Sequence, residues 1–173
     1  DTKEMWEMVW NNDIIALFQM EQQSGIQGIA LTKPESLEDL ATLNSVIRLM
    51  APERGMEQPL EKYARFRKNP QDWDKEMDSY SLTEEEKDLM KEMFEYSSGI
   101  SAQQEDLYRL ATHEKTGGMT LGEADQLRKA VAKKSGKDFA NFEEKYFKQV
   151  EKLGLSKNLT NYVWEQMVRP QAG

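Results

Sequence analysis

A cluster of basic residues stands out in the segment GEADQLRKAVAKKSGKD at 122–138. The chain as a whole is acidic, with 31 Asp and Glu against 23 Lys and Arg and a formal net charge of −8. Residues 126–137 nevertheless contain no carboxylate. Cations at this density could hold the phosphates of a nucleotide or a nucleic acid, because Lys and Arg neutralise phosphate charge. They could equally form the solvated face of a helix. The basic residues are Arg128, Lys129, Lys133, Lys134 and Lys137.

Helical spacing explains how the basic cluster could be the solvated face of a helix. Thr120 and Glu123 have the spacing of a capping box and predict that a helix starts here. On that helix Asp125 precedes Arg128 by three residues and Lys129 by four, so that it can pair with either base. Basic residues late in a helix also complement the helix dipole. Charge and spacing therefore leave phosphate binding and a solvated helix face equally open.

Other clusters are weaker candidates for chemistry. The acids of residues 74–85 have EF-hand spacing, but Ser79 stands where the calcium loop requires glycine, so an acidic loop before a capped helix is favoured. His113 is the only histidine and the chain has no cysteine, which argues against metal or nucleophilic sites built from these residues. Aromatic and basic residues alternate in 61–68, which indicates an amphipathic helix first and a nucleic-acid contact second.

The elements that would position these residues are helices. Eight segments combine helix-start signals with apolar residues at helical spacing, and Trp6, Trp10 and Trp164 are expected to pack in the core. We expect an all-α, irregular multi-helix domain of about seven or eight helices joined by short loops. The eight segments are 2–12, 36–50, 58–68, 83–99, 101–118, 120–135, 138–154 and 156–170.

The remaining segments carry weaker signals. Residues 13–21, DIIALFQME, are the only strand candidate, and the polar stretch 68–82 is expected to be a loop or insertion. Pro170 is expected to end the last helix. No apolar run approaches the roughly 20 residues that span a bilayer. The absence of cysteine fits a reducing compartment without establishing one, and no signal-peptide pattern opens the chain. The expected location is cytoplasmic, and the first residue, Asp1, suggests a piece of a longer chain.

Four motifs, in this order, give the sequence a resemblance to a known family. Phe18, Gln19, Glu21 and Gly25 resemble a phenylalanine-glutamine-x-glutamate motif followed by glycine, and the lysine-proline pair and leucine-rich segment of 31–52 resemble the next motif. Two more follow in GISAQQEDLYRLA and GMTLGEADQLRKAVAKK. Together they resemble the C-family replicative DNA polymerases, the bacterial DNA polymerase III alpha subunits, in the fingers region.

The chain departs from the family pattern at several positions. Arg48 matches the arginine of an arginine-proline-glycine-proline turn, but the turn itself is altered. Gln103 replaces a tyrosine and Asp106 a glutamine, while Lys129 replaces the second arginine of a pair. Lysine keeps the charge at that position but lacks the bidentate fork of a guanidinium. These departures suggest a divergent member, from a phage or an unusual bacterial lineage.

The resemblance implies a function for the basic cluster. Arg128 and Lys129, with Lys133, Lys134 and Arg48 as secondary candidates, would bind the triphosphate of the incoming nucleotide or the DNA backbone. Asp125 would orient Arg128, and the motif positions Gln19, Glu21, Gln104 and Glu105 have no assigned role.

The resemblance also implies what lies beyond this segment. Residues 1–35 would adjoin the palm and residues 36–173 would form the helical fingers. The catalytic aspartates and Mg²⁺ would belong to the palm of the parent enzyme, with primer-template DNA and deoxynucleotides as partners. No catalytic residue or metal ligand is expected in this chain, which alone would be inactive. The alternative is a stand-alone acidic all-α interaction module without catalytic function.

Overall fold

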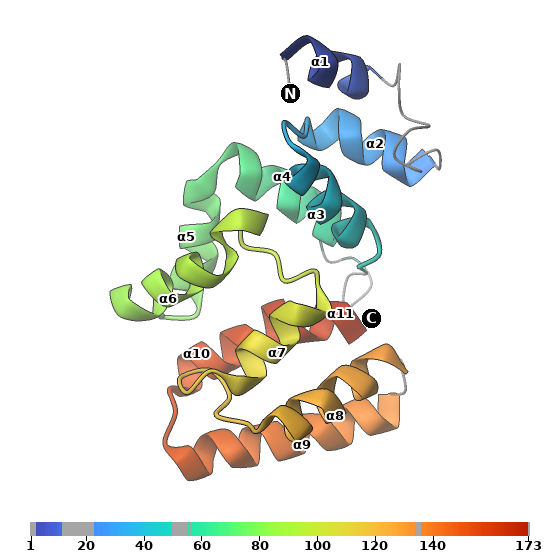
Figure 1. The fold of residues 1–173 in the computed structure, drawn as a ribbon. Coiled ribbons are helices and arrows are strands. Elements are labelled where there is room, and N and C mark those ends of the chain that lie inside the picture. Colours follow the sequence, from blue (N-terminus) through green and yellow to red (C-terminus); the bar gives the residue numbers. More distant parts are fainter. Residues whose placement is uncertain (1–2, 12–22, 50–54, 56, 134–135, 173) are drawn as a thin grey trace.

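The computed structural model describes residues 3–11, 23–49, 55, 57–133 and 136–172 (Figure 1). Within these ranges every regular element is a helix, which confirms the all-α class, and none of the helices is long and apolar enough to cross a membrane. The strand candidate at 13–21 lies outside the described residues. The helices are α1 (Lys3–Trp10), α2 (Gln23–Thr32), α3 (Leu37–Ile47), α4 (Pro59–Lys68), α5 (Pro70–Ser79), α6 (Glu84–Phe94), η2 (Glu95–Ser97), α7 (Gln104–Thr112), α8 (Leu121–Ala132), α9 (Gly136–Leu153), α10 (Lys157–Tyr162), η3 (Val163–Val168) and α11 (Arg169–Ala172).

Two helices that the sequence does not predict, α2 and α5, account for the difference from the expected number of helices. Because α10, η3 and α11 follow one another without a break, the described residues form ten helices apart from the short 3₁₀ turn η2, rather than seven or eight. The sequence does not predict α2, whose glycines weaken the helical pattern. At Gly28 a β-carbon would lie 3.0 Å from Leu43 and 3.3 Å from Ile47, so this glycine lets α2 approach α3 closely.

The stretch 68–82 was expected to be a loop, and this expectation is wrong. Residues 70–79 form α5, with Pro70 in the first turn, where a missing N–H is tolerated. Trp73 and Met77, one turn apart, are buried among the core residues, and the Trp73 Nε1 donates a hydrogen bond of 2.9 Å to the Tyr162 hydroxyl. Burial of these two side chains stabilises a segment whose composition is otherwise polar.

Helix starts with capping signals are confirmed. The side-chain oxygens of Ser36, Thr83, Thr120 and Ser156 each accept a hydrogen bond from the backbone N–H three residues later. Thr83 and Thr120 form complete capping boxes with the glutamates three residues on. Each cap satisfies an N–H that the helix cannot pair, which stabilises the fold by about 1 kcal/mol.

The boundaries of α7 differ from the prediction. It begins at Gln104 after Gln103, not Ser101, because the Asp106 carboxylate accepts the Gln103 N–H at 3.2 Å. It ends at Thr112, before the predicted stop at 117–118. There the chain turns back sharply, with the N–H groups of Gly117 and Gly118 both donating to the His113 carbonyl.

The last helix continues past Pro170, contrary to the prediction. It runs to Ala172, and the turns of Val163–Val168 before the proline have π geometry. A proline inside a helix removes a hydrogen-bond donor and crowds the carbonyl four residues earlier. The wider π turns lie where that carbonyl, of Gln166, is found, so the helix departs from regular geometry there instead of ending.

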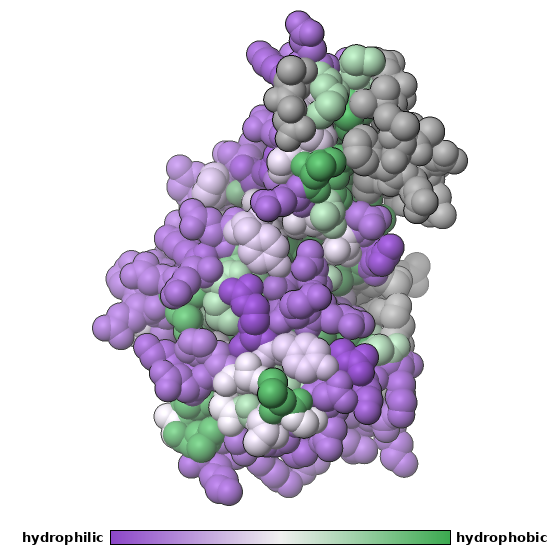
Figure 2. Space-filling model, in the orientation of Figure 1, coloured by the Kyte–Doolittle hydropathy of each residue, from purple (hydrophilic) through white to green (hydrophobic). Residues whose placement is uncertain are grey.

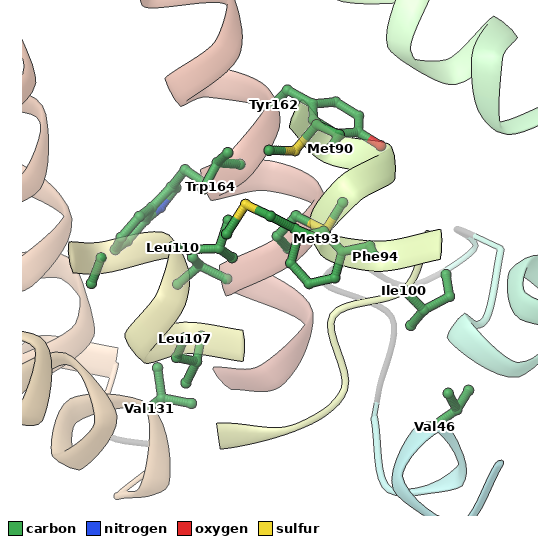
Figure 3. Packing of buried hydrophobic residues seen from close by; sticks show 14 of the residues in the cluster. Val46, Met90, Met93, Phe94, Ile100, Leu107, Leu110, Val131, Tyr162 and Trp164 are labelled. Atoms are coloured by element: carbon green, nitrogen blue, oxygen red, sulfur yellow. The ribbon is translucent and has the colours of Figure 1, made fainter. Parts of the chain in front are cut away.

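One hydrophobic core joins the two parts of the fold (Figures 1 and 3). Helices α7 to α11 lie together in one part and α1 to α6 in the other, and the core passes from Val46 through Phe94 and Leu110 to Trp164. Trp6 and Trp164 are buried and Trp10 is partly buried, as expected. On the face shown in Figure 2, hydrophobic residues form only small patches between hydrophilic ones.

Candidate nucleotide-binding cleft

Two predicted arginines line one cleft of about 570 Å³. Arg48 follows the last residue of α3, and Arg128 lies in the second half of α8. Gln104 and Glu105, at the start of α7, line the same cleft, as does Gln171 of α11. The cleft therefore forms where the ends of four helices meet, and it contains four of the residues that the sequence motifs single out.

Arg128 is held by two side chains. Asp125 Oδ1 accepts hydrogen bonds from Arg128 Nε at 3.1 Å and Nη2 at 3.0 Å. The Tyr108 hydroxyl of α7 donates to the same oxygen at 2.7 Å and accepts from Arg128 Nε at 3.1 Å. These hydrogen bonds use Nε and Nη2 of the guanidinium and do not involve its Nη1 amino group. Asp125 thus has the geometry to orient Arg128.

The electrostatics of this group keep it charged. The Tyr108 hydrogen bond, with those of Lys129 and Arg128, lowers the pKa of Asp125 to about 2. The hydrogen bonds of Arg128 with Tyr108 and then with Asp125 raise the pKa of its guanidinium. Because the pKa of Asp125 is depressed, the ion pairs are complete above the ordinary carboxylate pKa of about 4 and are lost only as the pH falls toward 2.

Of the other predicted cations, Lys129 and Lys133 do not line the cleft with Arg48 and Arg128. Lys129 pairs with Asp125 Oδ2 at 3.1 Å, and Lys129 and Lys133 line a shallow hollow of about 360 Å³ between α8 and α9. A single triphosphate site built from Arg48, Arg128 and Lys129 would need all three on one concave face, and only the first two share one. Lys134, Gln19 and Glu21 lie outside the described residues.

Sequence reasoning missed three residues that build or hold the cleft. Asp106 is 1 % exposed and accepts hydrogen bonds from the Tyr96 hydroxyl at 2.8 Å and from the Ala102 and Gln103 N–H groups. It thereby fixes the segment that carries Gln104 and Glu105. Its spacing of three residues after Gln103 is the capping signal that could have found it. The other two, Tyr108 and Gln171, carry no local signal, because their partners are remote in sequence.

Burial is the largest influence on the pKa of the Asp106 carboxyl. The loss of solvent raises the pKa of this carboxyl, although the Tyr96 hydroxyl and two backbone N–H groups donate to it and Arg109 lies 3.6 Å away. The hydrogen bonds and the nearby cation act in the opposite direction and oppose that rise.

The acidic stretch and the histidine have structural roles. Asp74 and Asp78 of residues 74–85 form ion pairs with Lys91 at 2.8 Å and Lys87 at 2.9 Å, and the segment is helix α5 followed by the capped α6. His113 Nδ1 accepts the Lys115 N–H at 3.0 Å in the turn after α7. Among the described residues no group of three or more histidine, cysteine or acidic side chains could hold a metal ion.

Comparison with known proteins gives the family. Residues 1–154 match the family described as the bacterial DNA polymerase III alpha subunit finger domain, and the chain belongs to this family. It is 34 % identical over 169 residues to the DNA-directed DNA polymerase of Bacillus phage SPbeta, a match that covers 98 % of this chain. It is 26 % identical over 167 residues, 95 % of this chain, to the DNA polymerase III subunit alpha of Escherichia coli.

The similarity extends to other polymerases but covers only part of each. The error-prone DNA polymerase of Vibrio parahaemolyticus is 27 % identical over 169 residues, 96 % of this chain and 15 % of that protein. The chain spans 13 % of the phage and Escherichia coli polymerases. No solved structure matches the chain significantly. A fingers domain is therefore what the sequence encodes, and a stand-alone interaction module is not favoured.

Proposed function

We propose that the chain forms the fingers of a template-directed DNA polymerase and binds the triphosphate of the incoming deoxynucleotide in the cleft between Arg48 and Arg128. The observation that carries this proposal is that Arg48, which follows α3, and Arg128 of α8 line one cleft. Guanidinium groups bind phosphate oxygens through paired, charge-assisted hydrogen bonds. Family membership supplies the reaction in which such a site is needed.

The contribution of the cleft to the reaction is positioning and charge stabilisation. Phosphoryl transfer depends on holding the phosphates in line and on neutralising the charge that develops on them. Asp125 and Tyr108 fix Arg128 before the nucleotide arrives, so little reorganisation accompanies binding. Contacts of this kind position the substrate without reading a base, and the template strand selects the nucleotide.

Other parts of the parent enzyme complete the active site in this proposal. The family resemblance assigns the carboxylates that hold Mg²⁺ to the palm, and residues 1–35 to the region that adjoins it. The described residues offer no group of side chains that could hold the metal. Primer-template DNA and the palm are the expected partners, and a bacterial or phage replication enzyme would act in the cytoplasm.

The substitution Arg128→Gln tests the cleft. In the polymerase that contains this segment, we expect kcat/KM for nucleotide incorporation to fall about ten- to hundred-fold, since a hydrogen bond to a charged group contributes about 1.5–3 kcal/mol. Primer-template affinity should change by less than about threefold. Single-turnover incorporation and DNA binding are measured side by side.

Arg65→Gln provides the matched control. Arg65 is also held by carboxylates, Glu57 at 2.8 Å and Asp72 at 3.1 Å, but it lies on α4 outside the cleft. Its replacement should leave incorporation unchanged. Equal losses of incorporation and DNA binding in the Arg128 variant would contradict the triphosphate role.

A further inference from the structure

The hollow beside Lys129 and Lys133 continues along α9 as a groove lined with lysines. One part of it is bordered by Lys129, Lys133 and Lys145, and an adjoining part by Lys145, Lys148 and Lys152. Asn141 and Lys145 line both parts, so the two adjoin: the first lies between α8 and α9, which pack side by side (Figure 1), and the second follows the flank of α9 alone. We call these five lysines and the depression between them the lysine groove.

The lysines of α9 share one flank of the helix. Phe142, Tyr146 and Val150 face the core, and Lys145, Lys148 and Lys152 follow one another at intervals of three and four residues on a side adjacent to that face. The acids Glu143 and Glu151 do not line the groove. The charges of α9 are therefore separated around its axis.

Most of these cations are available for a ligand. Among the described residues, Lys133, Lys145 and Lys152 form no ion pair, whereas Lys148 pairs with Glu144 at 3.0 Å and Lys129 with Asp125. The Lys145 ammonium donates to the Gln126 side-chain oxygen at 3.1 Å, which ties α9 to α8 at mid-groove. Among the described residues, Asp138 and Glu144 are the acids in the lining, so the five lysines leave a positive excess there on a chain of net charge −8.

The shape of the groove fits a linear polyanion. Lys133 lies near the level of Asp138 and Lys152 is 14 residues further along α9, so the groove spans roughly 21 Å at 1.5 Å per residue. That length corresponds to about six nucleotides of one strand of B-form DNA. Amides of Gln126, Asn141 and Gln149 alternate with the lysines and can donate to phosphate oxygens. Phe142 and Ala130, the two hydrophobic residues that line the part between α8 and α9, are both buried.

We infer that the lysine groove, which begins between α8 and α9 and continues along the flank of α9, binds the sugar-phosphate backbone of DNA, as a surface separate from the Arg48–Arg128 cleft. The inference rests on the proposed function, because a polymerase finger domain holds its nucleotide against a template strand. It divides the basic residues of the chain into two sites. Arg48 and Arg128 bind the nucleotide, and the five lysines of the groove hold the strand.

The experiment replaces three lysines of α9, giving Lys145→Gln, Lys148→Gln and Lys152→Gln in one chain. Binding to a fluorescent single-stranded 20-mer and to a hairpin primer-template is measured by anisotropy over a series of salt concentrations. We expect at least a tenfold weaker affinity at low salt. The slope of log K against log salt should fall by up to about 2 for the single strand and up to about 3 for the duplex.

The control chain carries Lys3→Gln, Lys68→Gln and Lys75→Gln. These lysines are exposed on α1, α4 and α5, and the control set also contains one ion-paired lysine, Lys75 with Asp72. The net charge changes equally in the two variants. Far-UV circular dichroism and thermal unfolding establish that both are folded. Equal DNA affinities in the two variants would overturn the inference, as would displacement of DNA by an equal concentration of polyglutamate.

Nucleotide binding separates this inference from the proposed function. Deoxynucleotide affinity is measured on the same variants and on Arg128→Gln. If the α9 variant binds DNA more weakly than its control while Arg128→Gln keeps its nucleotide affinity, the lysine groove is supported as the DNA site and the cleft is contradicted as the nucleotide site. If Arg128→Gln loses nucleotide affinity and the α9 variant binds DNA as tightly as its control, the cleft is supported as the nucleotide site and the lysine groove is contradicted as the DNA site.

Discussion

The contacts of Arg128 hold its guanidinium in one orientation before a phosphate binds. Its guanidinium is fixed by Asp125 within its own helix and by Tyr108 from the neighbouring α7. The helix spacing provides the first contact and the packing of two helices provides the second. Removal of either partner would free the side chain to rotate, and the entropy then lost on binding would weaken affinity.

Glu105 is the residue whose replacement should improve binding. Its carboxylate lines the cleft with Arg48 and Arg128, where it would repel a triphosphate. We expect Glu105→Gln to strengthen nucleotide binding about two- to tenfold, most strongly at low salt, because screening weakens the repulsion. Nucleotide affinity is measured by titration at two salt concentrations.

Glu114→Gln is the control for that prediction, since Glu114 is an exposed glutamate in the turn after α7 and does not line the cleft. It should leave affinity unchanged. A weaker affinity in the Glu105 variant would show that this carboxylate contacts the nucleotide favourably, for example through its sugar hydroxyl, and would contradict the repulsive role.

At the scale of elements, local sequence rules predict helix starts well and helix contacts poorly. Ser36, Thr83 and Thr120 identify their helices because a cap involves only residues three positions apart. Helices α2 and α5 escape prediction because they are stabilised by close approach to α3 and by burial of Trp73 and Met77. Such contacts join residues remote in sequence.

The turn after η2 shows the same dependence on packing, and it can be tested. Gly99 has a φ of +86°, and a β-carbon there would lie 2.6 Å from the Trp73 ring. We expect Gly99→Ala to lower the free energy of unfolding by about 2–4 kcal/mol, the sum of left-handed backbone strain and overpacking. Urea unfolding followed by circular dichroism measures the change.

The substitution Gly154→Ala separates the cost of the left-handed backbone from the cost of overpacking. It ends α9 with a φ of +66°, and nothing lies within 4 Å of the position of its β-carbon. Gly154→Ala should therefore cost only about 1–2 kcal/mol for the backbone conformation. Equal destabilisation by the two substitutions would show that the contact with Trp73 contributes nothing.

At the scale of the whole molecule, the C-terminal helix connects the two parts of the fold. Tyr162 accepts a hydrogen bond from Trp73 Nε1 and donates to Glu76 Oε2 at 2.9 Å, and Lys62 donates to Gln166 at 2.8 Å. These contacts join α4 and α5 to the helix that also packs against α7 and α9. The cleft depends on this junction, because Gln171 of the same helix binds Ser101 at 2.9 Å.

Tyr162→Phe is expected to destabilise the whole domain by about 1–3 kcal/mol, because the buried Trp73 N–H loses its acceptor. Tryptophan fluorescence and circular dichroism should report one common unfolding midpoint, lowered in the variant. A double-mutant cycle with Trp73→Phe should give less than additive effects. Separate midpoints for the two probes would contradict a single cooperative unit.

The sequence by itself determined the all-α class, the capped helix starts and, through ordered motifs, the polymerase finger family. These features depend on residues close together in the chain, where spacing and composition act directly. It also singled out Arg48 and Arg128, but not that they meet. The tertiary structure decided which cations share a site, because Arg128 and Lys129 are adjacent in sequence and both pair with Asp125, yet they line different depressions. It likewise decided that α5 is a helix and that the last helix passes Pro170, since burial and packing outweigh local preference there.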